Sequence, residues 1–387
     1  MNGKTNRIVS IDILRGVIMV VMALDHTRDF FSNFQYNPLD LEHTTTAMFF
    51  TRWITHFCAP VFVFLSGVSA FLSFNKGKTK KEAAMFLLSR GAWLIILEFT
   101  VIRFGWLFNL DYTHLIVQVI WAIGCSMILL SVLIFLPYPL ILAIGLAFIF
   151  GHNAFDSIHA DAMGGYGGFW HVFHEMGLVQ LSQSASVFVI YPLVPWIGVM
   201  AVGYCFGKVV TKPEVERNKW MYSLGAISIF LFCIIRYINI YGDSHYWISQ
   251  PTILKTILSF VDCTKYPPSL LYLLMTLGPA ILLLPILEKL NNTVSRIFLV
   301  FGRVPMFYYI LHIYLIHSMA MSIAYFQRIP TEYFTDTDKS FGPKPGWGYE
   351  LTGVYLYWIL AVIILYFPCR WFMKIKATHK KWWLSYL

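Results

Sequence analysis

An arginine and a histidine, Arg15 and His26, stand eleven positions apart in the first apolar segment of the chain. On an α-helix this spacing places them about 20° apart in azimuth and roughly 16 Å apart along the axis, so that they share one face. Asp12, Asp25 and Asp29 lie within about 80° of Arg15 on the same helical wheel. Because ionisable side chains inside an apolar segment are costly and usually functional, this stripe predicts the wall of an active site.

The residue types in this stripe suit a group-transfer reaction. A histidine can remove a proton from an attacking hydroxyl or amine near neutral pH, or carry an acyl group itself. We therefore predict His26 as the catalytic residue, with Asp25 close enough in sequence to orient its ring. The fixed charge of Arg15 suits either a phosphate group or a pair with Asp12. An Asp12–Arg15 pair that only docks the helix against its neighbours is the structural alternative.

The composition indicates a membrane protein. Of 387 residues, 58% are hydrophobic and only 13% are charged, and the mean hydropathy is +0.63. A soluble fold of this size needs more polar surface. We predict an all-α, polytopic integral membrane protein that forms a single domain over residues 1–387.

Ten apolar stretches are long enough to cross a bilayer. Their approximate bounds are 8–25, 53–74, 91–108, 114–136, 140–155, 187–207, 220–241, 269–287, 297–321 and 351–373. Lysine and arginine concentrate in every second connection and at both chain ends. The positive-inside rule therefore predicts that both termini are cytoplasmic.

The other global features exclude several function classes. The net charge of +9 arises from the predicted cytoplasmic connections, which gives no support to nucleic-acid binding. The six cysteines lack the paired spacing of a disulfide framework or a zinc site, so no metal is expected. Gly203 and Gly207 permit close helix approach, either within the chain or at the seam of a homodimer.

Three blocks of the sequence resemble a known superfamily. The stretch RIVSIDILRGVIMVVMALDH resembles the first helix of the transmembrane acyltransferases, whose acyltransferase-three family carries an arginine, ten intervening residues and a histidine; Arg15 and His26 match this spacing. The run PVFVF at 60–64 with Gly67, and the stretch FGRVPMFYYILHIYLIH at 301–317, are similar to prokaryotic relatives of heparan-alpha-glucosaminide N-acetyltransferase.

The resemblance implies transfer of an acyl group, usually acetyl from cytoplasmic acetyl-CoA, to a hydroxyl or amine of a sugar or envelope glycan. It places the chain in the bacterial cytoplasmic membrane. In the heparan acetyltransferase branch an asparagine tends to occupy the position of His26, and a histidine in the following loop is regarded as catalytic. The nearest counterparts here are His43 and, less closely, His56. Lys76 and Lys78 would attract the phosphates of CoA by their field, although setting topology is the alternative role.

Six further residues are predicted to line the substrate tunnel: Asp29, Arg52, His56, Arg303, Tyr309 and His312. Arg303 and His312 are nine positions apart and would lie on opposite faces of one straight helix, about 180° apart. Both can face one cavity only if the helix is kinked, and Pro305 could supply the kink.

A rival interpretation from another class is a proton-coupled secondary transporter with Asp12, Asp25 and His26 as a proton relay. The chain shows no clear inverted repeat, which counts against this interpretation. A third possibility is a membrane scaffold whose buried charges only hold helices together.

Overall fold

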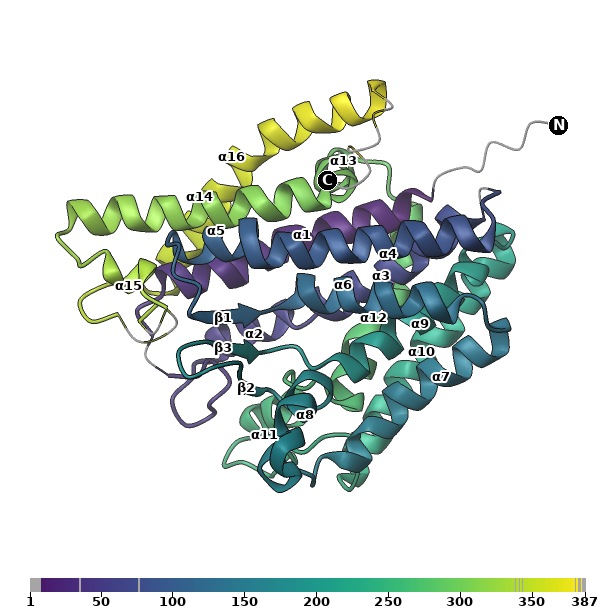
Figure 1. The fold of residues 1–387 in the computed structure, drawn as a ribbon, viewed down its shortest axis with the longest axis horizontal. Helices are drawn as coiled ribbons and strands as arrows, with labels where there is room; N and C mark the ends of the chain where they lie inside the picture. Colours follow the sequence, from purple (N-terminus) through teal and green to yellow (C-terminus); the bar gives the residue numbers. More distant parts are fainter. Residues whose placement is uncertain are drawn as a thin grey trace.

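The computed structural model describes residues 8–34, 36–75, 77–337, 339, 340, 342, 344–379, 381 and 384. In this part of the chain nearly all regular structure is helical, and the long helices lie side by side along the longest axis of the molecule (Figure 1). Eight helices are long and apolar enough to cross a membrane. The prediction of an all-α, polytopic membrane protein is therefore confirmed.

The helices of the bundle correspond to the ten predicted spans. They are α1 (Val9–Phe31), α2 (Thr46–Thr55) with α3 (Cys58–Phe74), α4 (Lys80–Leu97) with η1 (Glu98–Ile102) and α5 (Arg103–Leu107), α6 (Val119–Leu133), α7 (Tyr138–Gly151), α9 (Leu193–Val210), α10 (Glu214–Ile238), α12 (Leu270–Glu288), α14 (Pro305–Phe326) and α16 (Leu351–Thr378). Eight of these meet the requirements for a span. Because α1 holds five charged side chains and α6 has only 15 residues, the number ten stays a prediction.

The structure corrects the predicted spans at three places. The fourth does not begin as a helix, because His114–Val117 forms strand β1, which pairs in parallel with β3 (Ser186–Val189). The sixth, 187–207, begins in strand β3, and its helix α9 starts only at Leu193. The ninth is two helices: α13 (Thr293–Arg303) ends before Val304, and α14 begins at Pro305. Figure 1 shows α13 end-on, whereas α14 runs along the bundle. The chain thus turns at the proline for which a kink was predicted.

The two ends of the bundle differ. At one end α1 begins, α16 ends, and the segments 75–79, 211–213 and 289–292 connect helices (Figure 1). Lysines stand in or beside each of these segments, and we call this the basic end. The opposite end, here the loop end, carries the long connections. Which end faces the cytoplasm stays a prediction.

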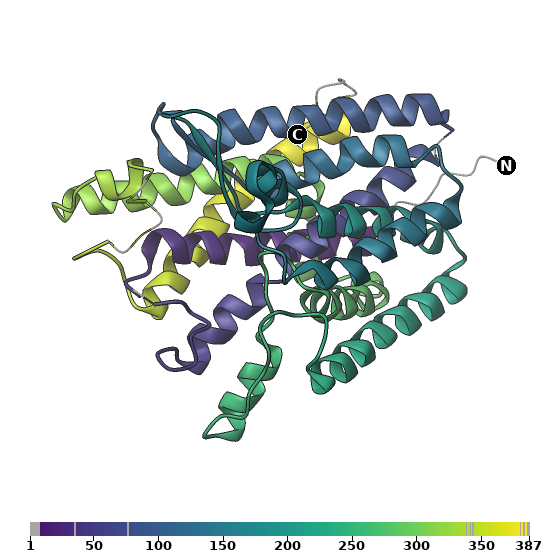
Figure 2. The same cartoon turned by 60° about the horizontal axis from the view of Figure 1, so that its bottom comes forward.

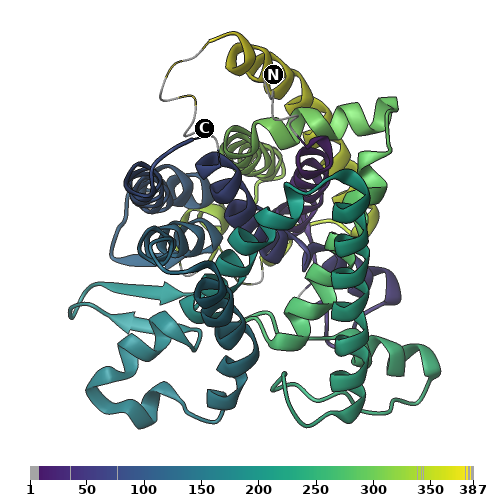
Figure 3. The same cartoon turned by 90° about the vertical axis from the view of Figure 1, so that its right-hand side faces the viewer.

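The long connections at the loop end are folded. They contain η2 (His152–Phe155), η3 (Ala160–Tyr166), α8 (Gly167–Phe173), β2 (Gly177–Gln180), α11 (Ile253–Val261) and α15 (Glu332–Thr335). Strand β2 pairs antiparallel with β3, so that the sheet order is β1-β3-β2. Figure 2 shows α11 projecting from the bundle, and Figure 3 shows the sheet projecting from one side of it.

Glycines set the closest helix crossings. A Cβ on Gly16 would lie 1.8 Å from the carbonyl oxygen of Phe298, and one on Gly302 would lie 1.7 Å from that of Asp12. No other residue fits there, so α1 and α13 touch backbone to backbone beside Arg15. Gly203 packs in the same way against α3, where a Cβ would lie 2.3 Å from the carbonyl oxygen of Phe64. This close approach is made within the chain, and the homodimer stays a prediction.

Candidate active site

The side chains of His26 on α1 and His312 on α14 are joined by a hydrogen bond. Nδ1 of His26 lies 2.7 Å from Nε2 of His312, and Nδ1 of His312 lies 3.1 Å from the carbonyl oxygen of Tyr308. His312 is fully buried, whereas His26 is only partly buried. The structure thus brings together two histidines that the sequence separates by 286 positions.

Two aromatic side chains enclose the ring of His26. The ring of Trp106 meets it edge-on with centroids 4.8 Å apart, and that of Tyr309 does so at 6.4 Å. Tyr309 also lines a cavity toward the basic end, and Trp106 lines a second cavity toward the loop end. His26 lines neither cavity itself. We call His26, Trp106 and Tyr309 the partition, because Tyr309 lines one cavity, Trp106 lines the other, and both rings contact that of His26.

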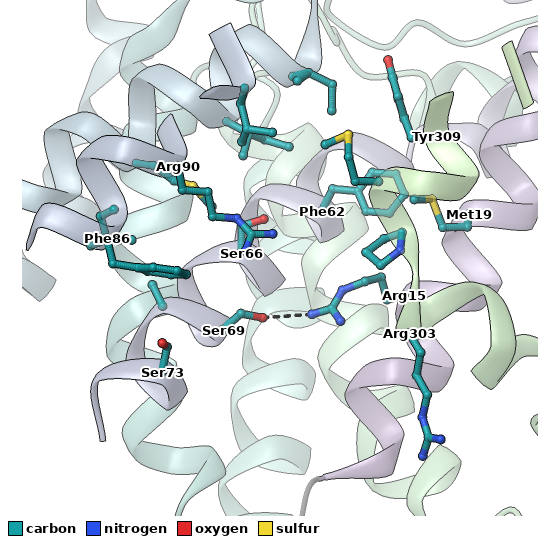
Figure 4. Close-up of a pocket in the computed structure, with 18 of the residues that line it drawn as sticks. Arg15, Met19, Phe62, Ser66, Ser69, Ser73, Phe86, Arg90, Arg303 and Tyr309 are labelled. Atoms are coloured by element: carbon teal, nitrogen blue, oxygen red, sulfur yellow. Dashed lines mark hydrogen bonds between the residues drawn. The ribbon is translucent and has the colours of Figure 1, made fainter. Parts of the chain in front are cut away.

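The basic-end cavity has a volume of about 330 Å³ and lies between α1, α3, α4, α6 and α14 (Figure 4). Its polar lining consists of Arg15, Arg90, Arg303 and Lys376 with Ser66, Ser69 and Ser73, and the described residues that line it include no Asp or Glu. The remaining lining is mostly apolar. The carboxylate of Asp12 lies 3.2 Å from Nη1 of Arg15 and 4.0 Å from Nε of Arg303, so it offsets part of this charge. The four cations of the wall still exceed this one carboxylate, which makes the cavity suitable for an anionic ligand.

Three hydrogen bonds to described residues hold Arg15 at this cavity. Nη2 donates to Oγ of Ser69 at 2.9 Å, and Nη1 contacts Asp12 Oδ1 at 3.2 Å and the carbonyl oxygen of Gly302 at 3.3 Å. In Figure 4 Arg15 and Arg90 point toward each other from opposite sides of the cavity. The Asp12–Arg15 pair predicted from the sequence is present. Arg15 lines the cavity even though it is paired with Asp12.

A further cation stands at the rim of the basic-end cavity. Nζ of Lys78 donates to Oγ of Ser73 at 3.1 Å and lies 4.0 Å from the ring centre of Phe86. Both of these partners line the cavity. Lys76, predicted for the same role, lies outside the described residues.

The loop-end cavity is larger, at about 570 Å³, and is lined by Trp106 of the partition. Its charged lining residues are Arg28, Asp29, Arg52 and Lys344, so the cations exceed the one carboxylate in the wall. Burial lowers the pKa of Lys344. Nη1 of Arg28 has no hydrogen-bond partner among the described residues. This cavity also favours a ligand that accepts hydrogen bonds or carries negative charge.

Asp25 contacts arginines rather than the ring of its sequence neighbour. Nη1 of Arg52 donates to both of its carboxylate oxygens, at 2.7 and 2.8 Å, and Nη2 of Arg28 lies 2.9 Å from Oδ1. Arg28 also contacts Asp29 at 2.7 Å. The ring of His26, which Asp25 was predicted to orient, is hydrogen-bonded to His312 instead. Asp25 therefore stabilises the loop end of α1 as part of a charge network.

A loop before α16 fixes the end of α1. Nε1 of Trp347 donates to the carbonyl oxygen of Phe30 at 2.8 Å, and the backbone N–H of Tyr349 donates to that of Phe31 at 2.7 Å. Carbonyl groups in the last turn of a helix lack partners within the helix, and these contacts supply them. Trp347 also lines the loop-end cavity, so the same loop closes its wall.

The two alternative histidines lie elsewhere. His43 is exposed at the loop end, where its Nδ1 lies 2.7 Å from Oδ2 of Asp40. This hydrogen bond lowers the pKa of Asp40. His56 is fully buried between α2 and α3 and packs edge-on against Tyr272. Neither histidine lines a cavity described here.

Of the predicted tunnel residues, Arg303 and Tyr309 line the basic-end cavity, and Asp29 and Arg52 line the loop-end cavity. Sequence reasoning missed Trp106, Arg90, Lys376 and Lys344. It also missed the serines at 66, 69 and 73, although their spacing of three and four places them on one face of an otherwise apolar helix. That polar stripe was the available signal.

Comparison with known families gives one match. Residues 7–241 match the family described as heparan-alpha-glucosaminide N-acetyltransferase, catalytic. A search of curated proteins finds no match. The matched region contains α1, α3, α4 and α6, which supply most of the wall of the basic-end cavity. His312 and Lys344 lie beyond it.

Proposed function

This chain belongs to the heparan-alpha-glucosaminide N-acetyltransferase catalytic family, and we propose that it moves an acetyl group from cytoplasmic acetyl-CoA to an amine or hydroxyl of a glycan on the other side of the membrane. Family membership and the apolar helices make it an integral membrane protein of the acetyltransferase type. The observation that carries the finer proposal is the position of His26, in a partition between two cavities that lie toward opposite ends of the bundle.

The basic-end cavity is the proposed donor site. CoA carries several phosphate charges, and Arg15, Arg90, Arg303 and Lys376 offer the matching positive charge. Lys78 at the rim extends this field outward. The apolar lining near Met19 and Phe62 suits the less polar arm that carries the thioester. A donor bound with its phosphates at the rim would bring its acetyl group toward Tyr309 and the partition.

The loop-end cavity is the proposed acceptor site. It opens among the folded connections at the end opposite the donor and has polar side chains throughout its wall. Arg28 and Arg52 are paired with Asp25 and Asp29, whereas Lys344 bonds to the carbonyl oxygen of Ser340. The charge of Lys344 therefore favours a saccharide that bears a carboxylate or phosphate beside the reacting group. The acceptor would approach the partition from the side of Trp106.

The proposed chemistry needs one proton acceptor at the partition. The acceptor nitrogen or oxygen forms a bond to the acetyl carbonyl carbon, and the bond from that carbon to the sulfur of CoA breaks. The proton leaves the acceptor for the ring of His26 and passes to the sulfur, so that CoA departs as the thiol. Holding both reactants against one ring supplies the orientation that such a transfer requires. Attack by the ring itself, through an acetyl-histidine, is the other route with the same products.

The test uses purified protein in nanodiscs with acetyl-CoA labelled in the acetyl group, and glucosamine, glucosamine 6-phosphate and a neutral disaccharide as acceptors. Released CoA, labelled sugar and covalent label on the protein are measured for wild type, His26→Ala and His43→Ala. We expect His26→Ala to lower turnover by about 100-fold or more. We expect His43→Ala to retain turnover, because His43 is exposed and bonds to Asp40, whereas His26 contacts the cavity-lining rings of Trp106 and Tyr309.

Unchanged turnover in His26→Ala would refute the role of the partition histidine. Failure of the wild-type protein to bind acetyl-CoA, together with proton-coupled uptake of a solute into vesicles, would instead support the transporter.

A further inference from the structure

The geometry of the two histidine rings determines the direction of the hydrogen bond between them. The ring planes are inclined by only 18°, and the centroids are 4.9 Å apart while the bonded nitrogens are 2.7 Å apart. Nitrogens this close cannot belong to rings stacked face to face, so the rings meet edge to edge in nearly one plane. The lone pair of an imidazole nitrogen lies in the ring plane, and the bond is therefore well aligned.

The second ring nitrogen of His312, Nδ1, has a contact that shows which nitrogen carries the hydrogen. Its Nδ1 contacts the carbonyl oxygen of Tyr308 at 3.1 Å. A carbonyl oxygen only accepts, so Nδ1 of His312 must carry a hydrogen. The ring is fully buried, and no carboxylate among the described residues bonds to it. A buried imidazolium without such a partner is costly, and the ring is therefore neutral. Its Nε2 then has only a lone pair to offer.

We infer that His312 is a positioning residue that holds His26 in the tautomer with hydrogen on Nδ1 and a free lone pair on Nε2. Nε2 of His312 accepts, so Nδ1 of His26 must donate. The remaining nitrogen of His26 has no hydrogen-bond partner in the described part of the chain, and the residue is partly exposed. The chain of bonds runs from His26 through His312 to the backbone of α14.

This inference deepens the function proposed above and rests on it for its catalytic meaning. A base must present a lone pair to the proton it removes, and the tautomer with hydrogen on Nε2 would present a donor instead. When Nε2 takes a proton, the bond from Nδ1 to His312 becomes charge-assisted and stronger. His312 therefore takes the place that a carboxylate occupies beside the histidine of many hydrolases, although it carries no charge of its own.

The two substitutions His312→Gln and His312→Phe separate acceptance of a hydrogen bond from ring packing. The amide oxygen of glutamine can accept from Nδ1 of His26, whereas phenylalanine fills the space without an acceptor. We expect His312→Gln to keep kcat within about tenfold of wild type and His312→Phe to lower it by about 100-fold or more, with KM for acetyl-CoA little changed in both. His317→Gln is the matched control, because His317 is equally buried on α14 and bonds to the carbonyl oxygen of Gly105 rather than to His26.

A spectroscopic measurement tests the tautomer without any turnover. Nitrogen and carbon NMR of the histidine-labelled full chain in nanodiscs distinguishes hydrogen on Nδ1 from hydrogen on Nε2, and the signal of His26 is assigned by its absence in His26→Gln. We expect the Nδ1-protonated form in wild type and His312→Gln, and a mixture in His312→Phe.

Hydrogen on Nε2 of His26 in the wild type overturns the inference. Equal loss of kcat in His312→Gln and His312→Phe also overturns it, because it assigns His312 to packing alone. The expected spectra without acetyl transfer in any variant would uphold the hydrogen-bond chain and reject the proposed function, so the two failures are distinguishable.

Discussion

Both carboxylate oxygens of Asp25 accept hydrogen bonds from one nitrogen of Arg52, at 2.7 and 2.8 Å. The pair joins the loop end of α1 to α2, and Arg28 completes it from one turn farther along α1. All three side chains are largely buried. The charges next to the candidate catalytic histidine therefore neutralise one another, and their removal should affect folding before chemistry.

Asp25→Asn should destabilise the protein strongly. The substitution leaves Arg28 and Arg52 with one carboxylate fewer in a buried setting, at a cost of about 3–5 kcal/mol. The free energy of unfolding in detergent, followed by tryptophan fluorescence, measures this. Asp40→Asn, which alters only exposed contacts, to His43 and to the backbone N–H of Glu42, is the control and should have little effect. A folded Asp25→Asn protein of normal stability that has lost turnover would instead place Asp25 in the chemistry.

Arg90→Gln should weaken binding of the donor. Removal of one cation from the wall of the basic-end cavity should raise KM for acetyl-CoA by about tenfold, since a charge-assisted contact contributes about 1.5 kcal/mol, and leave kcat largely unchanged. Initial rates at several acetyl-CoA concentrations and two salt concentrations provide the measurement. Arg296→Gln removes an exposed cation of α13 that does not line the cavity and should leave KM within a factor of two.

Lys344→Gln should change selection of the acceptor. Lys344 lines the loop-end cavity, so the variant should raise KM for glucosamine 6-phosphate by about tenfold and leave KM for glucosamine and for acetyl-CoA close to wild type. An equal rise of KM for neutral and anionic sugars would argue against recognition of charge by this residue.

Gly302→Ala should disrupt the crossing of α1 and α13. The added Cβ would lie 1.7 Å from the carbonyl oxygen of Asp12, so the backbones must move apart, at a cost of about 2–3 kcal/mol or more. Arg15 would lose its contact with the carbonyl oxygen of residue 302, and KM for acetyl-CoA should rise. Gly151→Ala is the control, because a Cβ there meets nothing within 4 Å. Thermal unfolding and donor kinetics of the two variants decide the matter.

Asp262→Asn should change how stability depends on pH. Burial raises the pKa of Asp262 from 3.8 to about 6, although His245 lies 3.4 Å away. A carboxyl group whose pKa rises on folding is favourable to the fold while protonated, so stability should fall as the pH rises from about 4 to above 6. The variant should therefore match wild type at pH 4 and exceed its stability by up to about 3 kcal/mol at pH 8. Unfolding curves at the two pH values test the sign.

The membrane architecture was predictable because the signal for each helix lies in its own local sequence. Runs of about twenty apolar residues need no partner to be recognised, and all ten predicted stretches contain a helix of the bundle. The change of direction near Pro305 could also be predicted from the sequence, since proline disrupts a helix whatever its tertiary contacts. Strand β1 could not be predicted from the sequence, because His114–Val117 is as apolar as the helix that follows. It forms a strand by pairing with Ser186–Val189.

The candidate site could be predicted only in part. Arg15 and His26 stand out because both are polar in one apolar helix. Their partners are set by tertiary contacts across 54 positions to Ser69 and 286 positions to His312, which spacing on one helix does not reveal. Asp25 was assigned to the wrong neighbour for the same reason: proximity in sequence favoured His26, whereas the fold supplied two arginines.

The partition of His26, Trp106 and Tyr309 has a consequence for the cell. A membrane protein with binding sites open to both aqueous compartments could let ions flow through it down their gradients. In this protein the basic-end cavity is lined by Tyr309 and the loop-end cavity by Trp106. The ring centroids of Trp106 and Tyr309 lie 4.8 and 6.4 Å from that of His26. In the reaction that we propose, only an acetyl group crosses this point, so the transfer would not require an open pore through which ions could leak.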